Sequence, residues 1–181
     1  GPTSTGGAPA AGGELIGIAM PTKSLERWNR DGAHLEKLLQ DAGFKTSLQY
    51  ADNKQDQQNN QIQNMLNDGA KVVVIASIDG TALGPVLSQA ASQNVAVIAY
   101  DRLINGSENV DYYATFDNSK VGQLQGQFIL DNADAFKGAD GTLNLEPFAG
   151  SPDDNNAKFF FSGIQLFNHF IFMFVKLLDL R

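Results

Sequence analysis

The chain has 181 residues, which is enough for one domain or for a lobe and a half of a larger protein, so it can bury a core. Its 13 Lys and Arg residues against 20 Asp and Glu residues give a net charge of -7, which argues against a nucleic-acid partner. The absence of cysteine excludes disulfides, thiolate metal sites and cysteine nucleophiles. Only His34 and His169 remain for zinc or base chemistry, so we expect no metal site.

Residues 1–13 carry no charge and no large apolar side chain. Such a segment cannot bury enough surface to offset the entropy of ordering, so we expect a flexible leader. It lacks the basic start and apolar core of a signal peptide. An expression linker and a natural tether both remain open.

From Glu14 onward, short apolar runs alternate with helix-like segments. The runs predict strands at 14–20, 44–50, 71–77, 95–100, 112–116 and 142–150, and helices at 25–43, 53–69, 81–94 and 119–136. Strands that are apolar throughout are typical of a parallel sheet covered by helices. The pattern therefore predicts an α/β fold with a doubly wound parallel sheet, whose ligand site lies beyond the C-terminal ends of the strands.

The loop after the first strand has neither the glycine pattern of a dinucleotide site nor that of a P-loop, so we expect no nucleotide cofactor. It offers Arg27 beside Trp28, which combine a rigid set of donors with a flat apolar face. An ordinary tryptophan packed on the sheet beside a solvated arginine is the open alternative.

Asp101 and Arg102 follow the strand at 95–100. A carboxylate and a guanidinium suit sugar hydroxyls, which both donate and accept hydrogen bonds, although a local ion pair would also explain the two residues. Asp154 and Asn156 lie in a polar run after 142–150. Such residues can present polar groups to a neutral ligand, and helix capping is the plainer explanation of the aspartate.

Four segments together resemble the periplasmic sugar-binding proteins of ABC importers, in particular the D-xylose-binding and multiple-sugar-binding types. The segments are LERWN (25–29), AYDRLI (99–104), FDNSKVGQLQG (116–126) and SPDDNNAK (151–158). The likeness runs in order from about Leu15 to Gly163. LacI-type repressors share this fold, but the acidic charge argues against them.

The resemblance implies a non-enzymatic receptor that closes two lobes on a monosaccharide. It implies that Arg27 hydrogen-bonds the sugar and that Trp28 provides an aromatic platform for it. It also implies that Asp101 and Arg102 hydrogen-bond the sugar hydroxyls. Asn156, with Asp154, would contribute from the second lobe. The first lobe would span 14–117 and a partial second lobe 118–163.

The resemblance also implies a periplasmic or other extracytoplasmic location, with a lipid tether through the leader as an option. The partners would be an ABC permease and, as a further option, a chemoreceptor.

Residues 164–181 depart from the family as an apolar tail with no amphipathic period. A membrane segment, a helix that covers exposed surface or pairs two copies into a homodimer, and non-native sequence are the alternatives. Since a cleft receptor buries its ligand between two lobes, we expect weak or absent sugar binding from this chain.

The main alternative function is a fragment or assembly form of such a receptor that binds no sugar and is held together by its Phe-rich tail. A glycosidase would need two opposed carboxylates across the sugar, a role into which Asp101 and Asp154 fit poorly.

Overall fold

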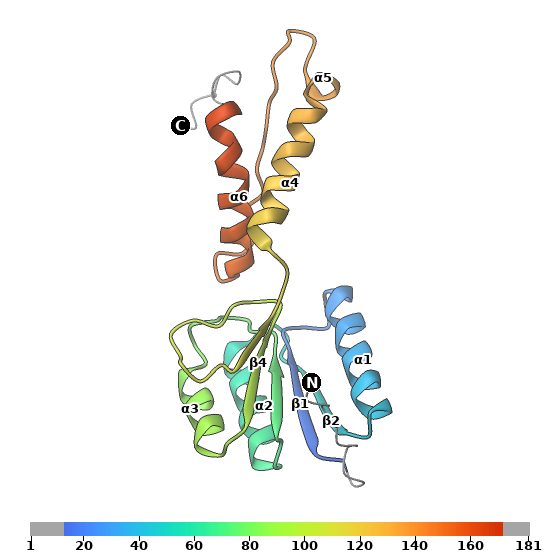
Figure 1. Ribbon diagram of the computed structural model, residues 1–181, viewed down its shortest axis with the longest axis vertical. Coiled ribbons are helices and arrows are strands. Elements are labelled where there is room, and N and C mark those ends of the chain that lie inside the picture. The colour runs from blue at the N-terminus through green and yellow to red at the C-terminus, as the bar shows by residue number, and fades with distance from the viewer. Residues whose placement is uncertain (1–12, 172–181) are drawn as a thin grey trace, which may run out of the picture. The chain divides into compact units, whose positions relative to one another are not determined.

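The computed structural model describes residues 13–171 and divides into two compact units between Ala114 and Thr115 (Figure 1). The first unit alternates strands and helices along the chain. Its elements are β1 (Leu15–Met20), α1 (Glu26–Asp41), β2 (Lys45–Tyr50), α2 (Gln55–Asn67), β3 (Val72–Ile75), α3 (Gly84–Ser92), β4 (Ala96–Tyr100) and β5 (Tyr112–Ala114).

The five strands form one sheet in the order β2-β1-β3-β4-β5, and every neighbouring pair is parallel. In the register, Ile18 of β1 lies between Leu48 of β2 and Val74 of β3. The predicted parallel α/β sheet is confirmed.

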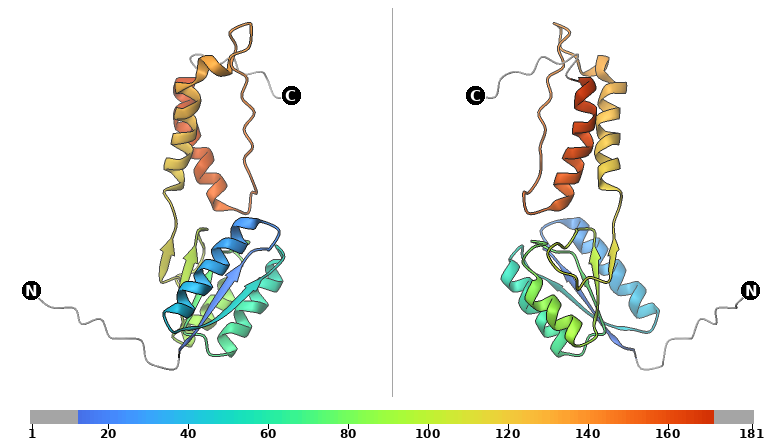
Figure 2. Two further views of the ribbon diagram at one scale, coloured as in Figure 1. Left: turned by 90° about the vertical axis from the view of Figure 1, so that its right-hand side faces the viewer. Right: turned by 60° about the vertical axis from the view of Figure 1, so that its left-hand side comes forward.

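Apolar side chains cover both faces of this sheet, as the continuous apolar runs of the sequence predicted. One cluster joins the sheet to α2 and α3 and includes Ile62, Leu87 and Val97. The other joins it to α1 and includes Ile18 and Trp28. Figure 2 shows α1 on one face of the sheet and α2 with α3 on the other. Burial on both faces explains why the three inner strands, β1, β3 and β4, carry few polar residues, whereas the edge strand β2 carries several.

Glycine ends two of the helices of this unit. Gly43 follows α1 with φ 91° and Gly69 follows α2 with φ 86°. A left-handed residue at this position lets the chain leave the helix, and glycine adopts it without a steric penalty. Each glycine therefore turns the chain into the next strand of the sheet.

The second unit contains α4 (Asn118–Asp131), α5 (Ala133–Phe136) and α6 (Asn155–Ile171). The carboxylate of Asp117 caps α4 by accepting the Lys120 amide at 2.9 Å. Helices α4 and α6 lie side by side in both views of Figure 2. A Cβ placed on Gly122 would overlap the carbonyl oxygen of Phe160, and one on Gly163 would overlap that of Ser119, so the two glycines permit this close approach.

Two predicted elements differ from the structure in this unit. The predicted helix 119–136 breaks at Asn132, whose side-chain amide donates to the Phe128 carbonyl at 2.8 Å and competes with the helical bonding pattern. The predicted strand at 142–150 is wrong, because the segment is irregular in the structure. A strand needs a neighbouring ladder, and the described part of the second unit offers only helices and connecting chain.

Residues 1–12 of the expected leader and the end of the apolar tail, residues 172–181, lie outside the described residues. The backbone of 164–171 continues α6. Among the helices that the structure describes, none has the length and apolar character needed to cross a bilayer.

Candidate functional site

The candidate site lies in the first unit, where the loops after β1, β3 and β4 meet at the C-terminal edge of the sheet. The strand order changes direction between β1 and β3, and doubly wound sheets bind ligands at such a switch point. Arg27, Trp28, Asp101 and Arg102 all belong to these loops or to the helix that follows them. The fold therefore brings four of the six predicted site residues to one edge.

Arg27 occupies the first turn of α1 and bonds two carboxylates. Its Nη2 donates to Asp101 Oδ1 at 2.6 Å, and its Nε donates to Asp31 Oδ2 at 3.3 Å. Burial by itself would lower the pKa of the guanidinium, but the hydrogen bond to Asp101 and the charges of Asp101 and Asp31 outweigh it and raise the pKa above the ordinary value. Arg27 is therefore a permanent cation, and 41% of its side chain is exposed.

Asp31 links this arginine to the end of β4. Its Oδ2 also accepts the hydroxyl of Tyr100 at 3.0 Å. Burial of the hydroxyl, followed by this hydrogen bond, raises the pKa of Tyr100 above 10.0. The sequence analysis missed both residues, although Asp31 follows Arg27 by one helical turn, a spacing that predicts an ion pair on a helix.

The aromatic ring of Trp28 lies against the guanidinium groups of both arginines. The guanidinium carbon of Arg27 lies 4.6 Å from the centre of its ring and that of Arg102 lies 5.2 Å away. Only 2% of the residue is exposed, because the ring packs against Ile18 and Met20. The described structure thus shows the packed tryptophan of the plainer interpretation, with its aromatic face turned to cations rather than to solvent.

Asp101 and Arg102 form the turn that follows β4. The Asp101 amide donates to the Ala114 carbonyl at 2.8 Å and the residue has φ 63°, a left-handed conformation that aspartate tolerates better than most residues. Arg102 Nη1 donates to the Ser77 carbonyl at 3.1 Å, which ties this turn to the loop after β3. The carboxylate of Asp101 reaches Arg27 across 74 residues of sequence.

Gln58 holds the loop that carries Ser77. Its amide nitrogen donates to the Ala76 carbonyl at 2.9 Å and its oxygen accepts the Ile78 amide at 3.0 Å. Gln58 is fully buried, whereas the other glutamines and asparagines of 55–64 are half-buried or exposed. Helical spacing could have predicted the burial of Gln58, because this residue lies one turn before Ile62 on the apolar stripe of α2.

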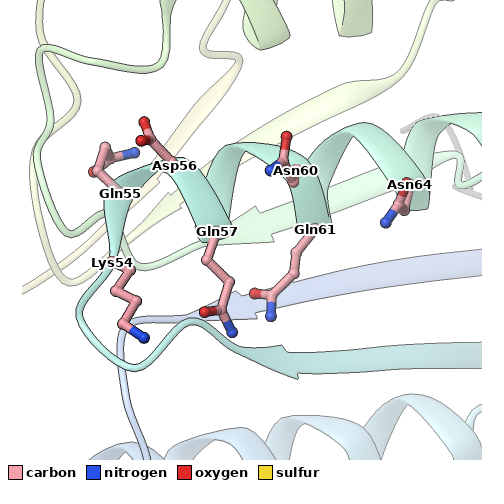
Figure 3. A pocket seen from close by; sticks show the side chains of 7 residues that line it. All are labelled: Lys54, Gln55, Asp56, Gln57, Asn60, Gln61 and Asn64. Carbon is pink, nitrogen blue, oxygen red and sulfur yellow. The ribbon is translucent and has the colours of Figure 1, made fainter.

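Glutamine and asparagine side chains on the solvated side of α2 line a wide, shallow hollow along this helix (Figure 3). Its lining comes from this helix and the residue before it: Lys54, Gln55, Asp56, Gln57, Asn60, Gln61 and Asn64. Gln61 donates to the Tyr50 carbonyl at 2.9 Å, so part of its polar capacity is already used within the fold. None of the predicted site residues lines the hollow, and we place the candidate site at the arginines instead.

Asp154 and Asn156 belong to the second unit. The Asp154 carboxylate accepts the Asn156 amide at 2.9 Å, which is the capping role that the sequence left open. The Asn156 side-chain oxygen accepts the amide of Asn118 at 3.0 Å, and Asn156 is 5% exposed. This bond joins the start of α4 to the start of α6 and fixes the orientation of the Asn156 amide.

The four charges around Arg27 balance. Arg27 pairs with the carboxylates of Asp31 and Asp101, and the guanidinium of Arg102 lies over the same tryptophan ring as that of Arg27, so two cations and two anions gather here. Such a set offers donors and acceptors without net charge, which suits a neutral ligand rich in hydroxyl groups. Among the described residues, no group of three or more His, Asp or Glu side chains could hold a metal ion.

A family model described as the periplasmic binding protein domain matches residues 16–167. The chain belongs to this periplasmic binding protein family. The matched range contains both compact units and all six predicted site residues, which confirms the family resemblance and the fold class predicted from the sequence.

Named relatives within this family bind sugars. The multiple sugar-binding periplasmic protein SbpA of Azospirillum brasilense is 57% identical over 148 residues, which are 82% of this chain and 41% of that protein. The D-xylose-binding periplasmic protein of Escherichia coli is 38% identical over 82% of this chain and 42% of its own length. The chain therefore spans about two fifths of the length of these curated relatives.

A solved structure supports the same assignment. It is an ABC transporter solute-binding protein from Clostridium phytofermentans with bound β-D-glucose, and it has a TM-score of 0.82 and 50% identity to this chain. The match covers 88% of this chain and 49% of that one. All three of these relatives are described as binding proteins.

Proposed function

We propose that this chain provides a sugar-binding surface of a solute receptor for a neutral monosaccharide, such as xylose or glucose, that serves an ABC importer. The observation that carries the proposal is the charge-balanced set of Arg27, Asp31, Asp101 and Arg102 at the switch point of the sheet. Sugar hydroxyls would accept from the guanidinium groups and donate to the carboxylates.

The residue roles follow from this geometry. Arg27, Asp101 and Arg102 would contact hydroxyls directly. Trp28 stays the proposed aromatic platform, and its ring also supports the two arginines. Asp154 and Asn156 of the second unit stay proposed sugar contacts on the strength of the family resemblance.

The wider context follows from the relatives. The names of these relatives place them in the periplasm and give xylose and multiple sugars as their ligands. We therefore propose a periplasmic or other extracytoplasmic location for this chain, with an ABC permease as one partner and a chemoreceptor as a second. A lipid tether at the leader and a homodimer through the tail belong to the same proposal. No catalytic step is needed, because a receptor releases its sugar unchanged.

Isothermal titration calorimetry of the folded 181-residue chain with D-xylose, D-glucose, D-galactose and L-arabinose tests this function. We expect weak but saturable heat with at least one sugar, and its loss in Arg102→Ala. Arg30→Ala is the matched control, because Arg30 lies on α1 with 72% of its side chain exposed and pairs only loosely with Glu26 at 3.9 Å. A folded protein that gives no heat, or an Arg102→Ala variant that binds as the original does, would contradict the proposal and favour a form that binds no sugar.

A further inference from the structure

The orientation of Arg27 depends on two anchors that lie at different places in the fold. Asp101, after β4, accepts a hydrogen bond from Nη2, and Asp31, on α1, accepts one from Nε. Because the guanidinium is planar and rigid, hydrogen bonds at two of its nitrogens fix its plane. Among the residues that the structure describes, none accepts from Nη1, so its two N–H groups remain for a ligand.

Asp31 is itself held by a residue of the sheet. The same Oδ2 that accepts Arg27 Nε at 3.3 Å also accepts the Tyr100 hydroxyl at 3.0 Å. Tyr100 is the last residue of β4 and directly precedes Asp101. The tyrosine thus fixes the carboxylate to the rigid sheet, and the carboxylate fixes the arginine.

Ordering the Arg27 side chain before the sugar arrives should increase the affinity for the sugar. With 41% of its side chain exposed, an arginine without these partners would sample many rotamers. A ligand would then have to order the side chain at the moment of binding, which weakens affinity. Hydrogen bonds made before the ligand arrives remove that cost.

We infer that Asp31 and Tyr100 are positioning residues that hold the Arg27 guanidinium ready for a sugar hydroxyl. The inference rests on the proposed function for its ligand. The arrangement of Arg27 in the sugar-free protein can be measured independently of that function.

Nitrogen-15 NMR spectra of the sugar-free chain provide this independent measurement. An arginine Nε–H that is held in a hydrogen bond exchanges slowly with water and gives a resonance, which can be assigned to Arg27 by its absence in Arg27→Lys. We expect Asp31→Asn to lose or strongly shift this resonance. Tyr100→Phe, which keeps the ring but removes the hydroxyl, should broaden it.

Sugar affinity is then compared by calorimetry. We expect the dissociation constant to rise about tenfold in Asp31→Asn and about threefold in Tyr100→Phe. Asp41→Asn is a matched control, because Asp41 also pairs with a cation four residues away on α1 but at an exposed position. Tyr112→Phe is the second control, since Tyr112 is 65% exposed. Both controls should leave the resonance and the affinity unchanged.

Each outcome decides a separate point. If the Arg27 resonance stays unshifted in Asp31→Asn, or if it is lost or shifted without any change of affinity, the positioning role is overturned. If the original protein binds no sugar, the proposed function fails, and the resonance alone decides whether Asp31 holds Arg27. Should Asp31→Asn fail to fold, as shown by its thermal unfolding, Tyr100→Phe carries the same test with the packing of the ring intact.

Discussion

At the scale of single residues, the site depends on a few side chains whose conformations are set by neighbours distant in sequence. Asp101 is the central example, because it is 7% exposed, has φ 63° and holds Arg27 at 2.6 Å. A left-handed conformation costs an ordinary L-residue about 1–2 kcal/mol, so the surrounding fold must impose it. The backbone and the carboxylate therefore make separate contributions at this position.

Substitution of Asp101 can separate the two contributions. Asp101→Ala and Asp101→Gly both remove the carboxylate, and only glycine adopts the left-handed conformation freely. We expect the glycine variant to have a free energy of unfolding about 1 kcal/mol higher than the alanine variant, the reverse of the usual order in helices and strands. Urea denaturation followed by circular dichroism measures the difference. An alanine variant as stable as the glycine variant would show that this backbone conformation carries no strain.

Tyr100 predicts a dependence of stability on high pH. Its pKa in the folded protein is raised above 10.0 by burial and then by Asp31, so the folded state keeps a proton that the unfolded state loses. The stabilisation is fully present below about pH 10 and disappears as the pH rises through the folded pKa. We therefore expect the free energy of unfolding to fall less steeply between about pH 9.5 and 11 in Tyr100→Phe, which cannot titrate, than in the original protein. Urea denaturation at several pH values checks this, and parallel curves would argue against a half-buried hydroxyl that bonds Asp31.

At the scale of elements, the sequence predicted the sheet well and the partners of its side chains poorly. Continuous apolar runs such as VVVI in β3 mark strands buried on both faces, and local sequence is enough to find them. The bond from Arg27 to Asp101 spans 74 residues. The residue types indicated that both side chains form charged hydrogen bonds, but not that they bond to each other. The failure at 142–150 has the same origin, since a strand exists only where another strand lies beside it.

Helices α4 and α6 give a test at this scale. Their approach relies on Gly122 and Gly163, each of which faces a carbonyl oxygen of the other helix. Gly122→Ala and Gly163→Ala should separate the helices and lower the free energy of unfolding of the second unit by about 1–3 kcal/mol. Gly84→Ala, in α3, is the control, because a Cβ there meets no atom within 4 Å. Thermal unfolding followed by circular dichroism compares the three variants, and equal melting temperatures would contradict close packing through glycine.

At the scale of the whole molecule, two compact units carry the predicted residues unequally. The first unit contains Arg27, Trp28, Asp101 and Arg102 together with the anchors Asp31 and Tyr100. The second contains Asp154 and Asn156, which bond within their own unit at the start of α6.

The family assignment could be made from four sequence segments because they combine turn residues with site residues, whereas Asp31, Tyr100 and Gln58 act through contacts that no local motif reveals.

The central claim is that a neutral sugar binds at the C-terminal edge of the sheet in the first unit. The most direct test is a titration of the nitrogen-15-labelled chain with D-glucose, followed through its backbone amide resonances. We predict saturable shifts concentrated at residues 26–31, 77–78 and 101–103, and their loss in Arg102→Ala. Shifts that lie elsewhere, for example along the hollow of α2, or no shifts at high sugar concentration, would contradict the claim.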